Sequence, residues 1–260
     1  MPQLLEECVK QWGLELEEPF QHGNVSVVVP AGDAVLKIQW PHRESEHEAA
    51  ALESWAGDGA VQLLEHDPAR YALLLERCRP GTHLSEAGPQ AALEALIGLL
   101  PRTWKPAGPP FRPLAEEAAW WVGYLPEDWE RAGRPFERSL LDAAVSALEE
   151  LAPTQGEQVL VHQDLHGENV LAAEREPWLV IDPKPLAGER EFGLAPIIRS
   201  FELGHSERDV VGRLDRLTSE LGLDRERARG WALGQTIAWS VDSDYRSSHL
   251  DTARWLLQAT

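Results

Sequence analysis

Cysteine is scarce in this sequence, and long apolar runs are absent. Cys8 and Cys78 are the only cysteines among the 260 residues. Two thiols cannot make a disulfide framework, so the sequence indicates a reducing compartment. No apolar stretch approaches the roughly 18 residues that a membrane-spanning helix needs. The N-terminal segment MPQLLEECVKQW lacks the basic flank and apolar core of a secretory signal and has the pattern of a short amphipathic helix. We therefore expect a soluble, cytoplasmic protein.

Positive charge is also in deficit. Lysine and arginine number 24 against 43 aspartates and glutamates, which gives a formal net charge of −19 at pH 7. A chain this acidic repels a phosphate backbone, so the composition argues against nucleic-acid binding. The same field attracts a polycationic small molecule, although surplus acid is also a common means of keeping a protein soluble. Composition leaves both interpretations of the charge open.

Apolar patterning divides the chain into two parts. From Val25 to Glu76 strand-like segments predominate, and one helix is expected from about residue 42 to residue 56, where Gly57 is placed to end it. After Cys78 helical spacing predominates, in the segments 88–102, 113–124, 136–151, 207–221 and 224–242. We predict an α+β fold with a small β-rich N-terminal lobe over residues 1–77 and a larger, mainly helical lobe over residues 78–260. A cleft between the lobes is then expected.

A polar octapeptide, HQDLHGEN at 162–169, interrupts the helical part between two short strand-like segments. His162, Asp164 and Asn169 have the spacing H-x-D-x-x-x-x-N of the catalytic loop in phosphoryl-transfer enzymes of the protein-kinase type. A carboxylate at Asp164 can orient an attacking hydroxyl group and take its proton late in the reaction. The amide oxygen of Asn169 is a hard ligand that suits Mg²⁺. We expect His162 to hold the loop by hydrogen bonds.

Asp182 lies thirteen residues after Asn169, at the end of the strand-like segment WLVID. A carboxylate at a strand end suits the second metal ligand, the role of the DFG aspartate in protein kinases, although this sequence reads IDPKP. Two other interpretations of these residues stay open. A zinc site of the form H-x-D-x-H would use His162, Asp164 and His166. Aspartate and asparagine in a loop also often serve only as turn or cap residues.

Upstream, Lys37 lies inside the apolar segment AVLKIQ, where its ammonium group needs a partner. A lysine in such a strand of a kinase contacts the α and β phosphates of ATP and pairs with a helix glutamate. Glu48 is our candidate for that glutamate, and the alternatives on the same predicted helix are Glu44, Glu46 and Glu53. An edge-strand lysine that extends its ammonium group to water is the other interpretation. Ser26, in QHGNVS, is a candidate phosphate contact.

Several segments together resemble the aminoglycoside phosphotransferase family, and in particular its branch of streptomycin 6-phosphotransferases and hydroxyurea-type resistance kinases. The resemblance spans nearly the whole chain from Val25 and is carried by LKIQWP, HEAAALESW, LLLERCRPGTHL, VLVHQDLHGENVL and VIDPKPLAGEREFGLAPIIR. Members of the family commonly carry an aspartate a few residues past the metal ligand, where this sequence has Phe192 and Gly193. We expect helix capping to differ there, with Glu191 as the substitute.

The resemblance implies a bilobal kinase-like fold, ATP with Mg²⁺, and O-phosphorylation of a small hydroxylated compound. It implies Asp164 as the base, Asn169 and Asp182 on the metal, and Lys37 on phosphate. It also places Leu75 and Glu76 at the connection between the lobes, where their backbone would bind adenine. ATP or GTP as the donor is left open.

The sequence therefore predicts an ATP-dependent O-phosphotransferase that acts on an aminoglycoside-like antibiotic. A kinase of a metabolite such as a sugar or amino sugar is the alternative within enzymes, and a pseudokinase-like nucleotide-binding protein is the alternative outside them. For a cationic acceptor we expect acids of the helical lobe at the cleft, with Glu202, Asp242 and Asp244 as candidates. Tryptophans that either stack on a sugar or belong to the core are Trp120, Trp121, Trp129, Trp231 and Trp239.

Overall fold

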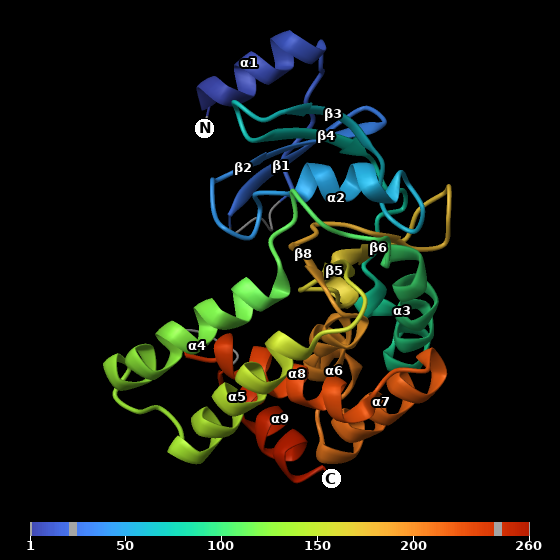
Figure 1. Cartoon of the computed structure of the whole chain (residues 1–260). Coiled ribbons are helices and arrows are strands. Elements are labelled where there is room, and N and C mark those ends of the chain that lie inside the picture. Colours follow the sequence, from blue (N-terminus) through green and yellow to red (C-terminus); the bar gives the residue numbers. More distant parts are fainter. Residues whose placement is uncertain (1, 21–24, 242–245, 260) are drawn as a thin grey trace.

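The computed structural model describes residues 2–20, 25–241 and 246–259. Figure 1 shows a small lobe, in which a sheet lies between the helices α1 and α2, above a larger lobe of helices. The predicted α+β architecture with two lobes is confirmed. Within the described ranges, no helix is both long enough and apolar enough to cross a bilayer.

The small lobe is a four-stranded antiparallel sheet with a helix on each face. Its strands lie in the order β1 (Ser26–Ala31), β2 (Ala34–Gln39), β4 (Ala72–Glu76) and β3 (Leu63–Asp67). The helix α1 (Pro2–Trp12) precedes the sheet, and α2 (Glu48–Trp55) follows β2. The helix expected from about residue 42 thus begins later, because residues 43–47 form turns.

Alternation along β2 decides which side chains face which helix. Leu36 and Ile38 are fully buried in a cluster with Cys8 of α1. Successive residues of a strand point to opposite faces of the sheet, so Lys37 points away from α1 and toward α2. The apolar neighbours of Lys37 thereby anchor the strand while the lysine itself faces the large lobe.

The helices of the large lobe agree with the predicted segments and add two. Those that correspond to predicted segments are α3 (Pro89–Thr103), α4 (Leu114–Arg131), α5 (Arg138–Leu151), α7 (Glu207–Leu221) and α8 (Arg225–Ala238). The short helix α6 (Ala195–Arg199) and the C-terminal α9 (Arg246–Gln258) were not predicted. Polar and charged residues make up much of α9, so the helix was not recognised in the sequence. Its buried apolar stripe consists of Leu250, Ala253 and Leu256.

Two short antiparallel pairs carry the polar octapeptide between the lobes. The strand β5 (Val159–His162) pairs with β8 (Pro185–Gly188), and β6 (Val170–Leu171) pairs with β7 (Leu179–Val180). The backbone of Val180 exchanges hydrogen bonds with the segment between α2 and β3: its N–H donates to Gly59 O at 2.9 Å, and its O accepts from Val61 N–H at 3.0 Å. The end of β7 is therefore fastened to the small lobe.

The acid that secures the segment after β8 is Glu189, and our expectation for Glu191 was wrong. Glu189 is buried and accepts from Arg227, from the indole of Trp231 and from the amide of Gly156 at 3.1 Å. Glu191 instead accepts from the backbone N–H of Asp224 at the start of α8. A buried carboxylate is stable here because an arginine neutralises it and three donors surround it.

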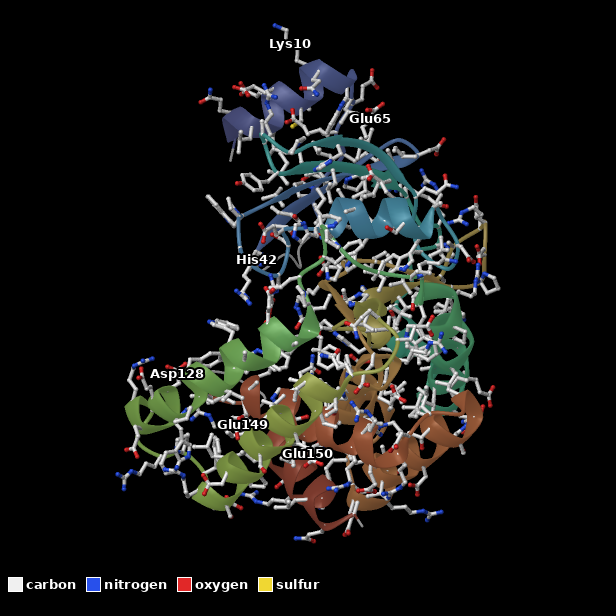
Figure 2. The ribbon with its side chains drawn as sticks, in the orientation of Figure 1. Lys10, His42, Glu65, Asp128, Glu149 and Glu150 are labelled. Carbon is white, nitrogen blue, oxygen red and sulfur yellow. The ribbon has the colours of Figure 1, made fainter. Side chains whose placement is uncertain are left out.

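Acidic side chains are spread over both lobes. Figure 2 labels Glu65 on β3, Asp128 on α4, and Glu149 and Glu150 on α5. Glu65, Glu149 and Glu150 are exposed. The surplus of acidic residues is therefore not confined to one lobe (Figure 2).

Candidate active site

Lys37 is the centre of a buried ion-pair group at the boundary of the lobes. Its Nζ lies 2.8 Å from both carboxylate oxygens of Glu48, and it also contacts Oδ1 of Asp182. Gln39 donates a hydrogen bond from its amide to the same glutamate. Burial opposes the charge on Lys37, but the carboxylates of Glu48 and Asp182 outweigh it and raise the lysine pKa. The structure thus places Glu48 on Lys37, as predicted, and brings Asp182 to the same ammonium group.

Asp182 is held in an unusual backbone conformation just after β7. Its φ is 51°, in the left-handed region that non-glycine residues seldom adopt and that is often seen at functional sites. The N–H of the preceding Ile181 donates to the carbonyl oxygen of Asn169 at 3.0 Å, which ties this turn to the octapeptide. Burial opposes ionisation of Asp182, yet Lys37 holds its pKa down to about 2. The side chain is 44% exposed, so one oxygen remains open to a ligand.

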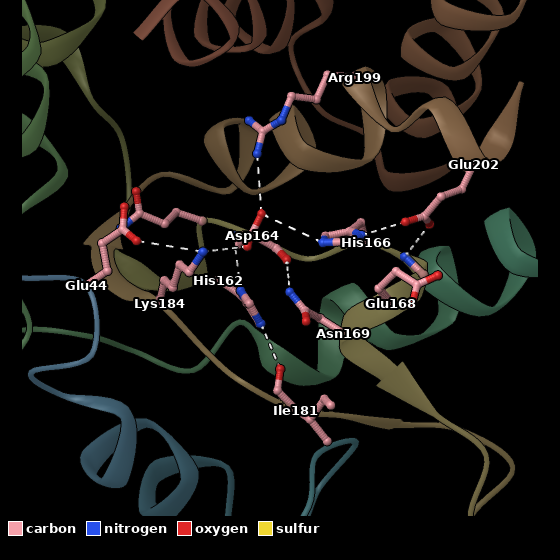
Figure 3. Close-up of polar contacts among 12 residues, drawn as sticks. Glu44, His162, Asp164, His166, Glu168, Asn169, Ile181, Lys184, Arg199 and Glu202 are labelled. Atoms are coloured by element: carbon pink, nitrogen blue, oxygen red, sulfur yellow. Dashed lines mark hydrogen bonds and ion pairs between the residues drawn. The ribbon is translucent and has the colours of Figure 1, made fainter. Parts of the chain in front are cut away.

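Hydrogen bonds from His162 and Asn169 shape the octapeptide (Figure 3). The Nδ1 of His162 accepts from the N–H of Asp164 at 3.1 Å, so its Nε2 carries the proton and donates to Ile181 O at 3.1 Å. Burial lowers the pKa of His162 to about 4, which keeps the ring neutral. Asn169 donates from Nδ2 to Asp164 O at 2.8 Å. The loop conformation therefore depends on both side chains.

Gly167 is required by a close approach inside the same loop. A Cβ there would lie 2.5 Å from Oε2 of Glu202 and 2.8 Å from the backbone nitrogen of Ser85. Glu202 accepts from Gly167 N–H at 3.0 Å and contacts His166 Nδ1 at 2.8 Å. The sequence suggested Glu202 as an acid for the acceptor, but the structure engages both of its oxygens within the loop.

Asp164 is surrounded by cations that the sequence did not lead us to. Lys184 Nζ lies 2.6 Å from its Oδ2, and an Arg199 nitrogen lies 3.4 Å from its Oδ1. His166 Nε2 is 3.9 Å from Oδ1 (Figure 3). Burial opposes the charge of Asp164, but Lys184, His166 and Arg199 outweigh it and lower the carboxyl pKa. Asp164 is therefore an ionised acceptor at neutral pH. The lysine between the two prolines of IDPKP was the one available signal for Lys184.

Two hollows are lined by Asp164 or by the basic side chains around it. The aromatic hollow, of about 590 Å³, is lined by Glu44, Trp120, Tyr124, Asp128, Lys184 and Trp239, among others. The loop hollow, of about 380 Å³, has Asp164, His166, Glu168, Arg199, Glu202 and Trp239 in its walls. Trp239 belongs to both hollows, and the cations of Lys184 and Arg199 lie 5.2 Å and 4.3 Å from its ring centre.

The five candidate tryptophans divide between the hollows and the core. Trp121, Trp129 and Trp231 are buried among apolar side chains and are core residues. Trp120 is 47% exposed and lines the aromatic hollow together with Trp239. Two of the five are therefore placed where a ligand can reach them.

The remaining predicted residues are placed as follows. Ser26 begins β1, opposite Gln39. Leu75 lies inside β4, opposite Val35 of β2. The N–H of Glu76 already donates to Gln62 O at 2.9 Å, and its carboxylate pairs with Arg175, so this amide cannot serve adenine. Asp242 and Asp244 lie outside the described residues.

The donor set fits Mg²⁺ better than Zn²⁺. Because the nitrogen of the Asn169 amide is occupied as a donor, its oxygen remains for a ligand, and Asp182 adds an ionised carboxylate. Both ring nitrogens of His162 are used in hydrogen bonds, so the zinc alternative loses one of its three ligands. In the part of the chain that the structure describes, no three His, Cys, Asp or Glu side chains are grouped to hold a metal ion.

Comparison with known proteins agrees with this geometry. A family model described as aminoglycoside/hydroxyurea antibiotic resistance kinase matches residues 17–248. A hydroxyurea phosphotransferase of Kitasatospora aureofaciens is 42% identical over 93% of this chain and 74% of its own length. A streptomycin 6-kinase of Streptomyces griseus is 40% identical over 93% of this chain and 83% of its own length.

Solved structures with the same fold are more distant in sequence. Choline kinase LicA from Streptococcus pneumoniae superposes with a TM-score of 0.72 at 15% identity, over 100% of this chain and 98% of that one. A thermostable mutant of aminoglycoside phosphotransferase APH(4)-Ia, in a ternary complex with AMP-PNP and hygromycin B, gives 0.65 at 15% identity, over 98% and 95% of the two chains. These likenesses establish the kinase-like fold.

Proposed function

The chain belongs to the family of aminoglycoside/hydroxyurea antibiotic resistance kinases, and on this premise we propose that it transfers the terminal phosphoryl group of ATP to a hydroxyl group of a streptomycin-like aminoglycoside. The observation that carries the proposal is Asp164, an ionised carboxylate at the wall of a hollow and within one short loop of Asn169. A base at the acceptor site and oxygen ligands beside it are what phosphoryl transfer to an alcohol requires. The relatives do not favour a sugar kinase or a non-catalytic protein.

The nucleotide end of the site is assigned to the small lobe. Lys37, oriented by Glu48, supplies a fixed positive charge for the phosphates of ATP or GTP. Adenine recognition is assigned to the backbone that follows β4. The N–H of Arg77 donates to Asp33 O at 3.1 Å, whereas the N–H of Cys78 makes no hydrogen bond within the described ranges. The prediction placed adenine on the backbone of Leu75 and Glu76; we therefore assign the amide contact to Cys78 and keep the carbonyl oxygen of Glu76 as the acceptor.

The metal is assigned to Asn169 and Asp182. Mg²⁺ neutralises the charge of the transferring phosphoryl group. Asp182 keeps its carboxylate ionised through Lys37, and the hydrogen bond from the Asn169 amide nitrogen to the backbone of Asp164 leaves the amide oxygen for the metal. A single loop thereby fixes a metal ligand and the base relative to each other.

The acceptor is assigned to the two hollows beside Asp164. In the aromatic hollow, carboxylates of Glu44 and Asp128 lie with the rings of Trp120, Tyr124 and Trp239. Carboxylates together with aromatic faces suit ammonium and guanidinium groups, which gain both ion pairing and cation–π attraction. This lining supports a cationic aminoglycoside more than an uncharged molecule such as hydroxyurea.

A screen for ADP release tests the proposed function. The purified protein is incubated with Mg²⁺, with ATP or GTP, and with a panel of aminoglycosides, hydroxyurea and common sugars. We expect turnover with a cationic aminoglycoside and phosphate on a hydroxyl group of the product by mass spectrometry. Turnover confined to sugars would replace the proposal with the metabolite kinase.

A further inference from the structure

We propose that Lys184 is a further catalytic residue, whose ammonium group contacts the transferring phosphoryl group. The inference rests on the proposed function and concerns a residue that the kinase motif does not include. Lys184 lies two residues after Asp182, and its Nζ is 2.6 Å from Oδ2 of Asp164. It is therefore near the metal ligand along the chain and in contact with the base.

The ammonium group of Lys184 lies beside the carboxylate that would hold the acceptor hydroxyl. Asp164 holds the attacking hydroxyl and takes its proton, while the hydroxyl oxygen forms its new bond to the terminal phosphorus and the bond from that phosphorus to the bridging oxygen breaks to release ADP. A cation that contacts the carboxylate is then also close to the non-bridging oxygens of the phosphoryl group, because the attacking oxygen lies next to both. Negative charge is spread over these oxygens in the transition state, so a preorganised cation there stabilises the transition state more than the bound substrates.

Three basic side chains lie near Asp164: Arg199, His166 and Lys184. Arg199 is fixed elsewhere: it is 7% exposed, donates to Gln235 and lies over the ring of Trp239. His166, inside the octapeptide, is bound by Glu202 at 2.8 Å. Lys184 has a flexible stem, and its other carboxylate neighbour, Glu44, is 3.7 Å away. Of these three basic side chains, Lys184 alone can change partner without breaking the loop.

The backbone at Lys184 is restricted on both sides. Pro183 and Pro185 flank Lys184 and restrict the backbone, and the Lys184 carbonyl oxygen accepts from Gln163 N–H at 3.2 Å. The side chain lines the aromatic hollow, with its Nζ 5.2 Å from the ring centre of Trp239. A restricted backbone with a long side chain suits a cation that leaves Asp164 for a phosphoryl oxygen when the hydroxyl group arrives.

Lys184→Met tests the role in turnover, and Lys105→Met is the matched control. Lys105 makes an ion pair of the same length, 2.6 Å to Asp58, and lines neither hollow. We expect Lys184→Met to lower kcat by about 10²-fold or more at every pH from about 5.5 to about 9, with the KM for Mg-ATP changed less than about threefold. If Lys184 only kept Asp164 ionised, the full rate would return at high pH, and that result would overturn the proposal.

A binding measurement makes the test independent of turnover. Aluminium fluoride with Mg-ADP imitates the transferring phosphoryl group, and thermal melting reports its binding. Wild type and Lys105→Met should gain further stability when aluminium fluoride is added to Mg-ADP. Lys184→Met should keep the rise in melting temperature caused by Mg-ADP and lose the additional rise caused by aluminium fluoride. Loss of Mg-ADP binding itself, or an unchanged further gain, would contradict the assignment.

Two comparisons keep the outcomes separate. Lys184→Gln, with similar length and a polar end, repeats both measurements if the methionine variant does not fold. If the wild type releases no ADP with any acceptor, the proposed function fails, whereas a fully active Lys184→Met beside an active wild type defeats only the role of Lys184.

Discussion

Lys37 lies 2.8 Å from both carboxylate oxygens of Glu48 and also contacts Asp182, which is 145 positions further along the chain. The lysine comes from β2, the glutamate from α2 and the aspartate from the end of β7, so one ammonium group joins the two lobes. Breaking a buried ion pair leaves an uncompensated charge. The three residues therefore bear on stability as well as on nucleotide binding.

Glu48→Ala should destabilise the protein by roughly 3 kcal/mol, since it removes the buried partner of Lys37 and leaves only Asp182. Urea unfolding of the protein without ligand measures this change. The exposed Glu53, on the same helix, gives the control: Glu53→Ala should stay within about 0.5 kcal/mol of the wild type. Equal effects of the two substitutions would contradict the importance of the buried pair.

Asp164→Asn should lower kcat by about 10² to 10⁴-fold while the affinity for Mg-nucleotide stays nearly intact, because the carboxylate acts on the acceptor hydroxyl. Steady-state kinetics and calorimetric titration with Mg-AMP-PNP measure the two effects. A loss of nucleotide affinity as large as that of Asp182 variants would show that Asp164 is not dedicated to the acceptor.

Asp182→Asn should instead weaken Mg-nucleotide binding by at least about tenfold, because an ionised ligand is lost from the metal. Asparagine tolerates the φ of 51° at this position, so the substitution adds little backbone strain. Asp182→Ala should show the same loss of affinity together with a lower melting temperature. If neither substitution changed the affinity for Mg-nucleotide, Asp182 would not be a metal ligand.

Stability should fall as the pH drops from about 6.5 to about 4 because His162 is buried. Its pKa is about 4 in the fold against 6.5 for the free group, so in this window the unfolded chain binds the additional proton. The contribution, at most about 3 kcal/mol, is fully present above about pH 6.5. Urea unfolding at about pH 7 and about pH 4.5 measures it.

The control for this pH effect separates His162 from other histidines. His162→Asn should show a smaller loss between the two pH values, and the exposed His66→Asn should behave as the wild type. Some loss should persist in His162→Asn, because burial also lowers the pKa of His249 to about 4. An undiminished loss in His162→Asn would contradict the assignment.

Asp128→Asn should raise the KM for a cationic aminoglycoside several-fold at low salt and leave the KM for Mg-ATP unchanged. In the wild type the acceptor KM should rise as salt increases to about 0.5 M, because partly exposed ion pairs are screened. Asp142, which also pairs with a helical arginine but lines neither hollow, provides the control variant. A salt effect of equal size on nucleotide and acceptor would argue against ion pairing in the aromatic hollow.

The chain sequence alone determined the architecture and most of the residues assigned to the nucleotide and metal. Strand and helix periods are local patterns, so the order of elements could be predicted apart from β8, α6 and α9. Lys37, Asp164, Asn169 and Asp182 could be identified because phosphoryl transfer restricts both residue type and spacing. Glu48 could be chosen among four glutamates of the predicted helix, and the structure places it on Lys37.

Only the tertiary structure decided which cations and aromatic rings surround the reacting group. Lys184 and Arg199 contact Asp164 although they are 20 and 35 positions away in the sequence. Neither separation can be predicted from the periodic spacing of residues in a helix or strand. Two neighbouring tryptophans on α4 differ in exposure, because helix packing buries Trp121 and leaves Trp120 at the aromatic hollow. Glu202 is bound within the loop because α6 brings the following turn against Gly167. Contacts between remote segments depend on how the elements pack, and a single sequence does not contain that information in any local pattern.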